Sequence, residues 1–195
     1  MASRVRRPWP SWGSAEDVGA ARVGSGLVIS VALLVAFAQV VAAIPQAIET
    51  RIDQQGCWTA DPETVTAYAR RGLGVQECPA PTGYRLFLVS SDARSWVDVR
   101  STGSGTTWSG EHSVVYDSPI GNFPNVAGNT VEWRLESGRA KALIFKVVAQ
   151  GRAEPSQTLS ALYVVALGSE RIWLAGHVAT IGEARLLADS GASGQ

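Results

Sequence analysis

The sequence predicts a mainly β fold: a small antiparallel β-sandwich or curled barrel of about seven strands, with two short peripheral helices. Apolar and polar residues alternate with a period of two, most clearly in Thr130–Glu136. Segments rich in Gly, Ser and Pro separate the apolar runs. The pairs Ser137-Gly138 and Gly168-Ser169 leave no room for a crossover helix, so the strands that they join should be antiparallel.

The expected strands follow one another along most of the chain, each a short run rich in β-branched and aromatic residues. In chain order they are Tyr84–Ser91, Ser95–Arg100, Ser113–Tyr116, Thr130–Glu136, Lys141–Ala149, Leu159–Leu167 and Arg171–Ala179.

Two short helices are expected at the edges of this fold. Asp61-Pro62-Glu63 supplies an N-cap, a proline at the first helical position and an acid near the positive helix end, and Gly72 can end the helix. Thr180-Ile181-Gly182-Glu183 matches a capping box, which predicts a second helix through Leu187.

An uncharged apolar segment, residues 27–44, follows a basic region and predicts export. Small residues, Val41 and Ala43, close it as a signal peptidase requires. Its 18 residues are more than a usual signal peptide core and close to the roughly 20 that span a bilayer. A cleaved signal peptide and a retained membrane anchor with the basic end inside therefore both stay open. A buried core helix is the third alternative, because the segment has no polar face.

These features divide the chain into four expected parts. They are a basic, disordered region (1–26), a signal peptide h-region or membrane anchor (27–43), a single exported β-rich domain (44–190) and a flexible tail (191–195).

The only two cysteines, Cys57 and Cys78, lie just after the export segment. In an oxidising compartment such a pair indicates a disulfide bond. A zinc site would need further ligands that the surrounding sequence does not offer. We therefore expect a disulfide bond and no metal site.

Charge and motifs exclude several functions. Basic and acidic residues are balanced, 17 of each, and no basic stripe suits nucleic acid. No GxGxxG, Walker loop or HExxH motif is present, so we expect no cofactor. The expected partner is an envelope protein or glycan, met in the periplasm or outside the cell. Membrane contact is expected only through residues 27–44, if they are not cleaved.

Candidate binding residues cluster in an expected loop, residues 117–129. Its polar side chains are Asp117, Asn122, Asn125 and Asn129. Loops often carry binding residues, and these oxygens could ligate calcium, although strong calcium sites have more carboxylates. Because Asn and Gly are also ordinary turn residues, a purely structural turn is the alternative.

Five tryptophans could either fill the core or stack on sugar rings: Trp58, Trp96, Trp108, Trp133 and Trp173. Core packing is the default for tryptophan. Trp108 is the exception, because it lies in an expected loop, residues 101–110, and it is therefore a candidate binding residue.

The segment Ser104-Gly105-Thr106-Thr107-Trp108 resembles the Ser-Gly-x-x-Tyr loop of small bacterial periplasmic lysozyme inhibitors, with tryptophan in place of tyrosine. Those proteins are exported β-barrels in which the loop enters the lysozyme cleft. The match covers five residues, and no function is carried over from it.

An enzyme is the less favoured class. His112 and His177 are the only histidines, and no nucleophile elbow accompanies Ser118. We expect an exported, non-enzymatic binding or accessory domain. The alternatives are a periplasmic hydrolase that uses Asp98 or Asp117 with His177, and a membrane-anchored subunit of an envelope complex.

Overall fold

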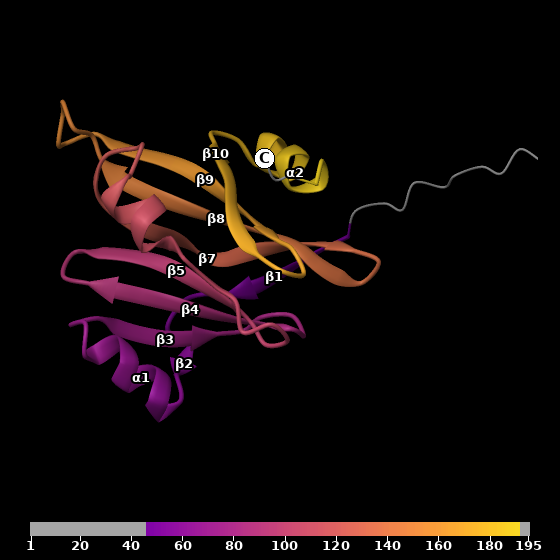
Figure 1. Cartoon of the computed structure of the whole chain (residues 1–195). Coiled ribbons are helices and arrows are strands. Elements are labelled where there is room, and N and C mark those ends of the chain that lie inside the picture. The colour runs from indigo at the N-terminus through magenta and orange to yellow at the C-terminus, as the bar shows by residue number, and fades with distance from the viewer. Residues whose placement is uncertain (1–45, 192–195) are drawn as a thin grey trace, which may run out of the picture. The chain divides into compact units, whose positions relative to one another are not determined.

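A computed structural model describes residues 46–191. These residues form ten strands and three short helices (Figure 1). The strands pair antiparallel in two five-stranded sheets, which are open and are not closed into a barrel. The mainly β prediction is confirmed, and the two sheets are consistent with a β-sandwich. The curled-barrel alternative is wrong, and the described residues hold ten strands where about seven were expected.

The first sheet, sheet A, has the order β1-β7-β8-β9-β10, and the second, sheet B, has the order β2-β3-β4-β5-β6. The strands of sheet A are β1 (Gln46–Arg51), β7 (Asn122–Glu136), β8 (Arg139–Gln150), β9 (Thr158–Leu167) and β10 (Ile172–Val178). The strands of sheet B are β2 (Trp58–Thr59), β3 (Gly74–Cys78), β4 (Tyr84–Ser91), β5 (Arg94–Ser101) and β6 (Thr107–Ser109).

Six of the seven expected strands are present, as β4, β5 and β7 to β10. The seventh is wrong: Ser113–Tyr116 lies in η1, a π-helix of Glu111–Tyr116. The strands β1, β2, β3 and β6 were not expected. These four strands are short, and β1 is exposed along most of its length, so none of them carries a clear apolar alternation.

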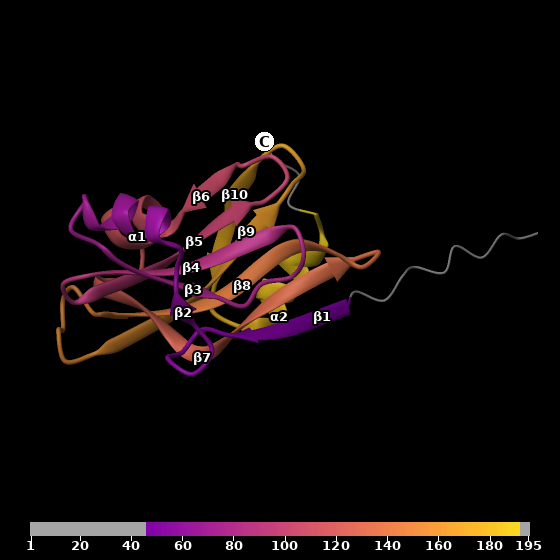
Figure 2. The ribbon, with the colours of Figure 1, turned by 90° about the horizontal axis from the view of Figure 1, so that it is seen from below.

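The main hydrophobic core lies between the two sheets, which form two layers in Figure 1 and overlap face-on in Figure 2. The Tyr84 ring of sheet B lies 6.3 Å from the Trp133 ring of sheet A, and the Trp108 ring lies 6.4 Å from the Phe145 ring. Trp96, Trp108 and Trp133 are all buried, whereas Trp58 is exposed. The core role is thus confirmed for Trp96 and Trp133, and Trp108 joins them although it was expected to be exposed. The expected loop position of Trp108 is wrong, because this residue lies in β6.

Helix α2 (Ile181–Asp189) covers the face of sheet A that points away from sheet B (Figure 1). Both hydrogen bonds of the predicted capping box, between Thr180 and Glu183, are present. Ala184 and Ala188 are buried against Ala142, Ile144 and Val164. These sheet residues alternate with residues of the main core, so β8 and β9 are buried on both faces, as a continuous apolar run predicts.

A buried ionic cluster fixes α2 to β7. Glu132 and Arg134, on β7, are only 6 % and 7 % exposed. Arg134 donates to Glu132 and to both carboxylate oxygens of Asp189, at 2.6 to 3.0 Å. Arg185 donates to Glu132 from the helix, at 2.7 to 3.1 Å. The polar side of the alternating β7 pattern was expected in solvent and is instead covered by α2.

Helix α1 (Pro62–Ala69) packs on the opposite side, on the outer face of sheet B. The Asp61 side chain accepts from the Thr64 N–H, which confirms the expected N-cap. Tyr68 anchors the helix: its ring lies 6.3 Å from the Phe87 ring, and its hydroxyl donates to Asp98 at 2.6 Å.

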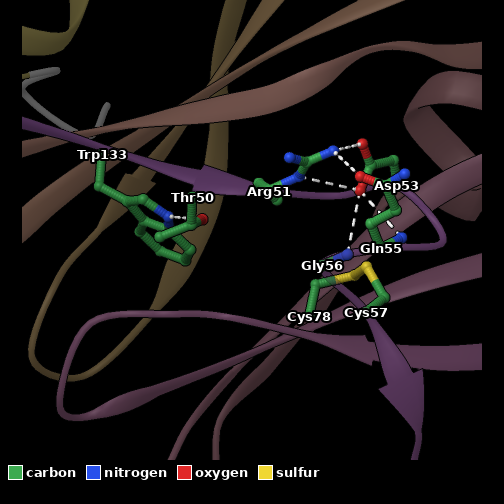
Figure 3. The surroundings of a disulfide bond; sticks show 8 residues. All are labelled: Thr50, Arg51, Asp53, Gln55, Gly56, Cys57, Cys78 and Trp133. Atoms are coloured by element: carbon green, nitrogen blue, oxygen red, sulfur yellow. Dashed lines mark hydrogen bonds and ion pairs between the residues drawn. A yellow bond between two sulfur atoms is a disulfide. The ribbon is translucent and has the colours of Figure 1, made fainter.

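The predicted disulfide bond between Cys57 and Cys78 is present (Figure 3). It closes a segment that contains β2, α1 and β3. Figure 3 also shows the turn that leads from β1 to Cys57, where the Asp53 carboxylate accepts from the Gln55 and Gly56 N–H groups. The disulfide therefore ties the α1 segment to sheet B where the chain passes from one sheet to the other.

Residues 27–44, on which the export prediction rests, lie outside the described residues, as does most of the expected tail. Within residues 46–191 no helix has the length and apolar character needed to cross a membrane.

Candidate functional site

Two adjoining hollows, of about 350 and 460 Å³, lie where η1 leads into β7. The first is lined by the segment after η1 and the second by β7 and β8. Phe123 lines both hollows. We call this region the loop-end surface and define it by Arg94, Tyr116, Asn122, Phe123, Asn125 and Arg152.

Phe123 is held in an unusual backbone conformation. Its φ angle is +47°, in the left-handed region that costs a residue with a side chain roughly 1–2 kcal/mol. It lies in a β-bulge, because the β7–β8 register shifts between Asn122 and Asn125. Bulges commonly re-aim a side chain near a functional site. The Phe123 ring is 44 % exposed, and the Arg94 guanidinium stacks over it at 4.9 Å.

Gly121 fixes the path of the chain before this bulge. A Cβ atom at Gly121 would lie 2.1 Å from the carbonyl oxygen of Gln150, so only glycine allows this close approach to β8. Ser118 is buried, and Arg152 donates a hydrogen bond to its carbonyl oxygen. Burial raises the pKa of Tyr163 to about 12. The segment that carries Phe123 is therefore anchored on sheet A.

Tyr116, the last residue of η1, is the second exposed ring, at 69 %. Its hydroxyl donates to Glu111 at 3.3 Å, and the His112 ring meets it edge-on. Asp117 pairs with His112, with 2.7 Å between Oδ2 and Nδ1, and both side chains are exposed. Such an exposed pair adds little stability. It does hold Asp117 beside the Tyr116 ring.

Asn125 has a structural role. Its Nδ2 donates to the carbonyl oxygens of Ala93 and Phe123, at 2.8 and 3.0 Å, and its Oδ1 accepts from Ser95 at 3.1 Å. These bonds join the β4–β5 turn of sheet B to the bulge of β7. They thereby hold Arg94 against Phe123.

The predicted binding residues are only partly brought together. Asn122 and Asn125 line the loop-end surface, and Asp117 lies next to it. Trp108 is buried in β6, and Asn129 lies further along β7, where its carbonyl accepts from the Ile52 N–H. The expected loop over 117–129 is present only over residues 117–121, because β7 begins at Asn122.

Sequence reasoning missed Arg94, Tyr116, Phe123 and Arg152. The one local feature of Phe123 is that it is an aromatic residue among the turn formers Gly121, Asn122 and Pro124, and this pattern does not distinguish an exposed ring from a buried one.

The residues considered for hydrolysis, Asp98, Asp117 and His177, each contact a different partner and are not bonded to one another. Asp98 is bonded to Tyr68 and Asp117 to His112. His177 lies exposed on β10, with its ring 5.7 Å from the Tyr163 ring. Among residues 46–191 no group of three or more His, Cys, Asp or Glu side chains is placed to hold a metal ion.

Comparisons of the chain with protein-family models, with curated proteins and with solved structures find no match.

Proposed function

We propose that the protein is an exported, non-enzymatic binding domain that holds an extended glycan of the cell envelope on the loop-end surface. The observation that carries the proposal is the exposed Phe123 side chain, which is held on a strained backbone and lines two adjoining hollows. Strain of this kind persists only where the surrounding structure enforces it, and it is concentrated at functional sites.

The chemistry of the loop-end surface suits a sugar chain. The C–H face of a sugar ring packs on an aromatic ring, and Phe123 and Tyr116 offer two exposed rings. Sugar hydroxyls need donors and acceptors beside that ring, which Asn122 and Arg152 supply. The two hollows that share Phe123 would hold successive units of an extended ligand. A π-helix beside the surface adds support, because π-helical turns are rare and often lie at functional sites.

Export is proposed from the apolar segment 27–44 and from the disulfide bond, since disulfides persist mainly in oxidising compartments. We expect the protein from its own host to be a soluble envelope species that begins near Ile44. It should gain two hydrogens on reduction. Intact-mass measurement of the soluble and membrane fractions, before and after reduction, tests this. A full-length species in the membrane fraction would contradict cleavage and favour an anchored subunit.

Replacing Phe123 with alanine is expected to weaken glycan binding by about tenfold, the effect of losing one aromatic contact of roughly 1.4 kcal/mol. The measurement is calorimetric titration with soluble oligosaccharides, for which a panel of β-1,4-linked N-acetylglucosamine oligomers and dextran oligomers serves as the probe. Trp58→Ala is the matched control, because Trp58 is also an exposed aromatic residue, at 50 %, but lies on β2. Its affinity should equal that of the unchanged protein.

A second variant separates binding from folding. Phe123→Gly removes the same ring and also relieves the left-handed backbone, so it should be more stable than Phe123→Ala by about 1 kcal/mol. Both variants should bind equally weakly. If no glycan of the panel binds, the glycan proposal fails; capture of an envelope protein that Phe123→Ala abolishes would replace it with a protein ligand.

A further inference from the structure

A larger hollow, of about 680 Å³, lies between α1, β4, β5 and the turn that follows β5. We call it the α1 cleft. It shares no lining residue with the loop-end surface. Three arginines line it: Arg71 from the end of α1, Arg85 from β4 and Arg100 from β5. Whether each guanidinium is already paired with an acid of the protein decides whether the cleft can bind an anion.

Two of the three arginines are neutralised by acids of the protein. Arg85 donates to both Glu77 oxygens, at 2.7 and 2.6 Å, and to Asp61 at 2.7 Å. Arg71 forms an ion pair with Glu111 of η1. In contrast, Arg100 is exposed and makes no side-chain hydrogen bond or ion pair with any residue from 46 to 191.

The position of Arg100 makes this unmatched charge unfavourable. Arg100 lies directly opposite Arg85 in the β4–β5 register. Like charges directly opposite each other on neighbouring strands repel. Because the acids around Arg85 are already bonded to it, they leave Arg100 without a counter-charge. An anion bound at Arg100 would supply it.

Two threonine hydroxyl groups, of Thr102 and Thr107, line the cleft together with Arg100. Thr107 is paired with Arg100 in the β5–β6 register, and Thr102 lies two residues after Arg100, where the turn between the two strands begins. Both threonines line the α1 cleft and are exposed. Within the described part of the chain neither hydroxyl forms a hydrogen bond. A guanidinium with two free hydroxyls is a donor set that suits the oxygens of a carboxylate or phosphate.

The acids in and under the cleft do not occupy this donor set. Asp98, only 2 % exposed, accepts from the Tyr68 hydroxyl and from the Gly110 N–H at 3.1 Å, and burial raises its pKa. Burial and Asp98 also raise the pKa of Tyr68, against the opposing charges of Arg71 and Arg100. Glu63, the remaining lining acid, lies in the first turn of α1, whose positive end favours it there.

We propose that Arg100, Thr102 and Thr107 form an anion subsite in the α1 cleft, which binds the carboxylate or phosphate group of a small polar ligand. The subsite does not depend on glycan binding at the loop-end surface. The cleft volume leaves room for the rest of such a ligand beside the buried Phe87 ring that lines it.

The test is chemical footprinting of arginine in the purified full chain. Phenylglyoxal modifies accessible guanidinium groups, and peptide mass spectrometry reports the rate at each arginine. Inorganic phosphate and citrate are the two probes, each compared with sodium chloride at equal ionic strength. At an anion concentration about ten times the dissociation constant, modification of Arg100 should slow by about tenfold, as mass action requires. The more protective probe identifies the preferred oxyanion.

Arg139 is the matched control, because it is also exposed and unpaired among the described residues but begins β8, outside the cleft. Its rate should not change. A Thr102→Val, Thr107→Val double variant leaves the arginine in place and should reduce the protection of Arg100. Equal protection of Arg139 and Arg100, protection unchanged in the double variant, or no protection by either probe would overturn the anion subsite.

Discussion

Replacing Cys57 and Cys78 with alanine is expected to lower the free energy of unfolding by about 3 kcal/mol. The disulfide joins residues 21 positions apart, and on the chain-entropy estimate a loop of this length gives a stabilisation of that size. The loss should be concentrated in α1, which has no buried residue of its own and relies on its attachment to sheet B. Chemical denaturation measures the total, and hydrogen exchange of residues 57–78 measures the local part.

Reduction of the unchanged protein is the control for this prediction. With only two cysteines in the chain, reduction removes the same cross-link without changing other contacts. Its free energy of unfolding should match that of the alanine variant. A loss of less than about 1 kcal/mol in both would mean that the unfolded chain already holds these residues close together, so that the cross-link restricts it little.

Replacing Glu132 with glutamine is expected to lower the free energy of unfolding by about 2 to 3 kcal/mol at neutral pH. Glu132 is buried and is the acceptor shared by Arg134 and Arg185. Glutamine keeps the shape of the side chain but removes the charge that compensates these arginines. Charge-assisted hydrogen bonds and buried ion pairs are the interactions whose one-sided loss is most destabilising. Denaturant titration of both proteins measures the difference.

Glu136→Gln provides the matched control. Glu136 lies on the same strand and pairs with Lys141 at 3.3 Å, but its side chain is 69 % exposed. An exposed pair of this kind should change stability by less than about 1 kcal/mol. If Glu132→Gln and Glu136→Gln were equally stable, the buried ionic cluster around Glu132 would contribute no more to stability than an exposed ion pair.

The pH dependence of the Glu132 variant gives an independent check. The pKa of Glu132 is lowered from its ordinary value of 4.5, since the hydrogen bonds and charges of Arg185 and Arg134 outweigh the opposing effect of burial. A lowered folded-state pKa means that the stabilisation is fully present above pH 4.5 and is lost as the pH falls through the folded-state pKa. The difference between the protein and Glu132→Gln should therefore shrink in acid. If the stability difference between the two proteins grew in acid, the assigned role of the Glu132 charge would be wrong.

Much of the fold could be predicted from the sequence, because several elements carry local signals. The alternation of β7, the turn at Ser137-Gly138 and the capping box of α2 each depend on neighbouring residues alone. Both residues of that turn have positive φ angles, as a tight hairpin requires. The cysteine pair was equally informative, since the chain offers only one possible disulfide.

The rest depends on tertiary contacts that local patterns do not report. Strand β1 is mostly exposed and gains its hydrogen bonds only from β7, far along the chain. Trp108 follows a run of Gly, Ser and Thr that predicts a loop, yet it pairs with Val99 and fills the core against Phe145. The five-residue resemblance to lysozyme-inhibitor loops therefore ends in a buried ring, which is not available to enter another protein.

The candidate site was predicted only in its polar part. Asn122 could be named because amides in a loop suggest binding, whereas Phe123 and Tyr116 have the composition of core residues. What makes Phe123 a candidate is its left-handed backbone and the packing of Gly121 against Gln150. Neither can be seen in a sequence without the sheet that imposes it.

The pairing of β1 with β7 also has a consequence for the order of folding. Sheet B consists of five strands that are consecutive in the chain, and β3, β4, β5 and β6 can pair with one another by closing short loops. Sheet A instead takes its first strand from before all of sheet B and its other four from after it. Contacts of such long sequence separation form slowly. A chain that crosses a membrane from its N-terminus would thus present β1 first and complete its pairing only after β7 has emerged, with sheet B able to assemble in the interval.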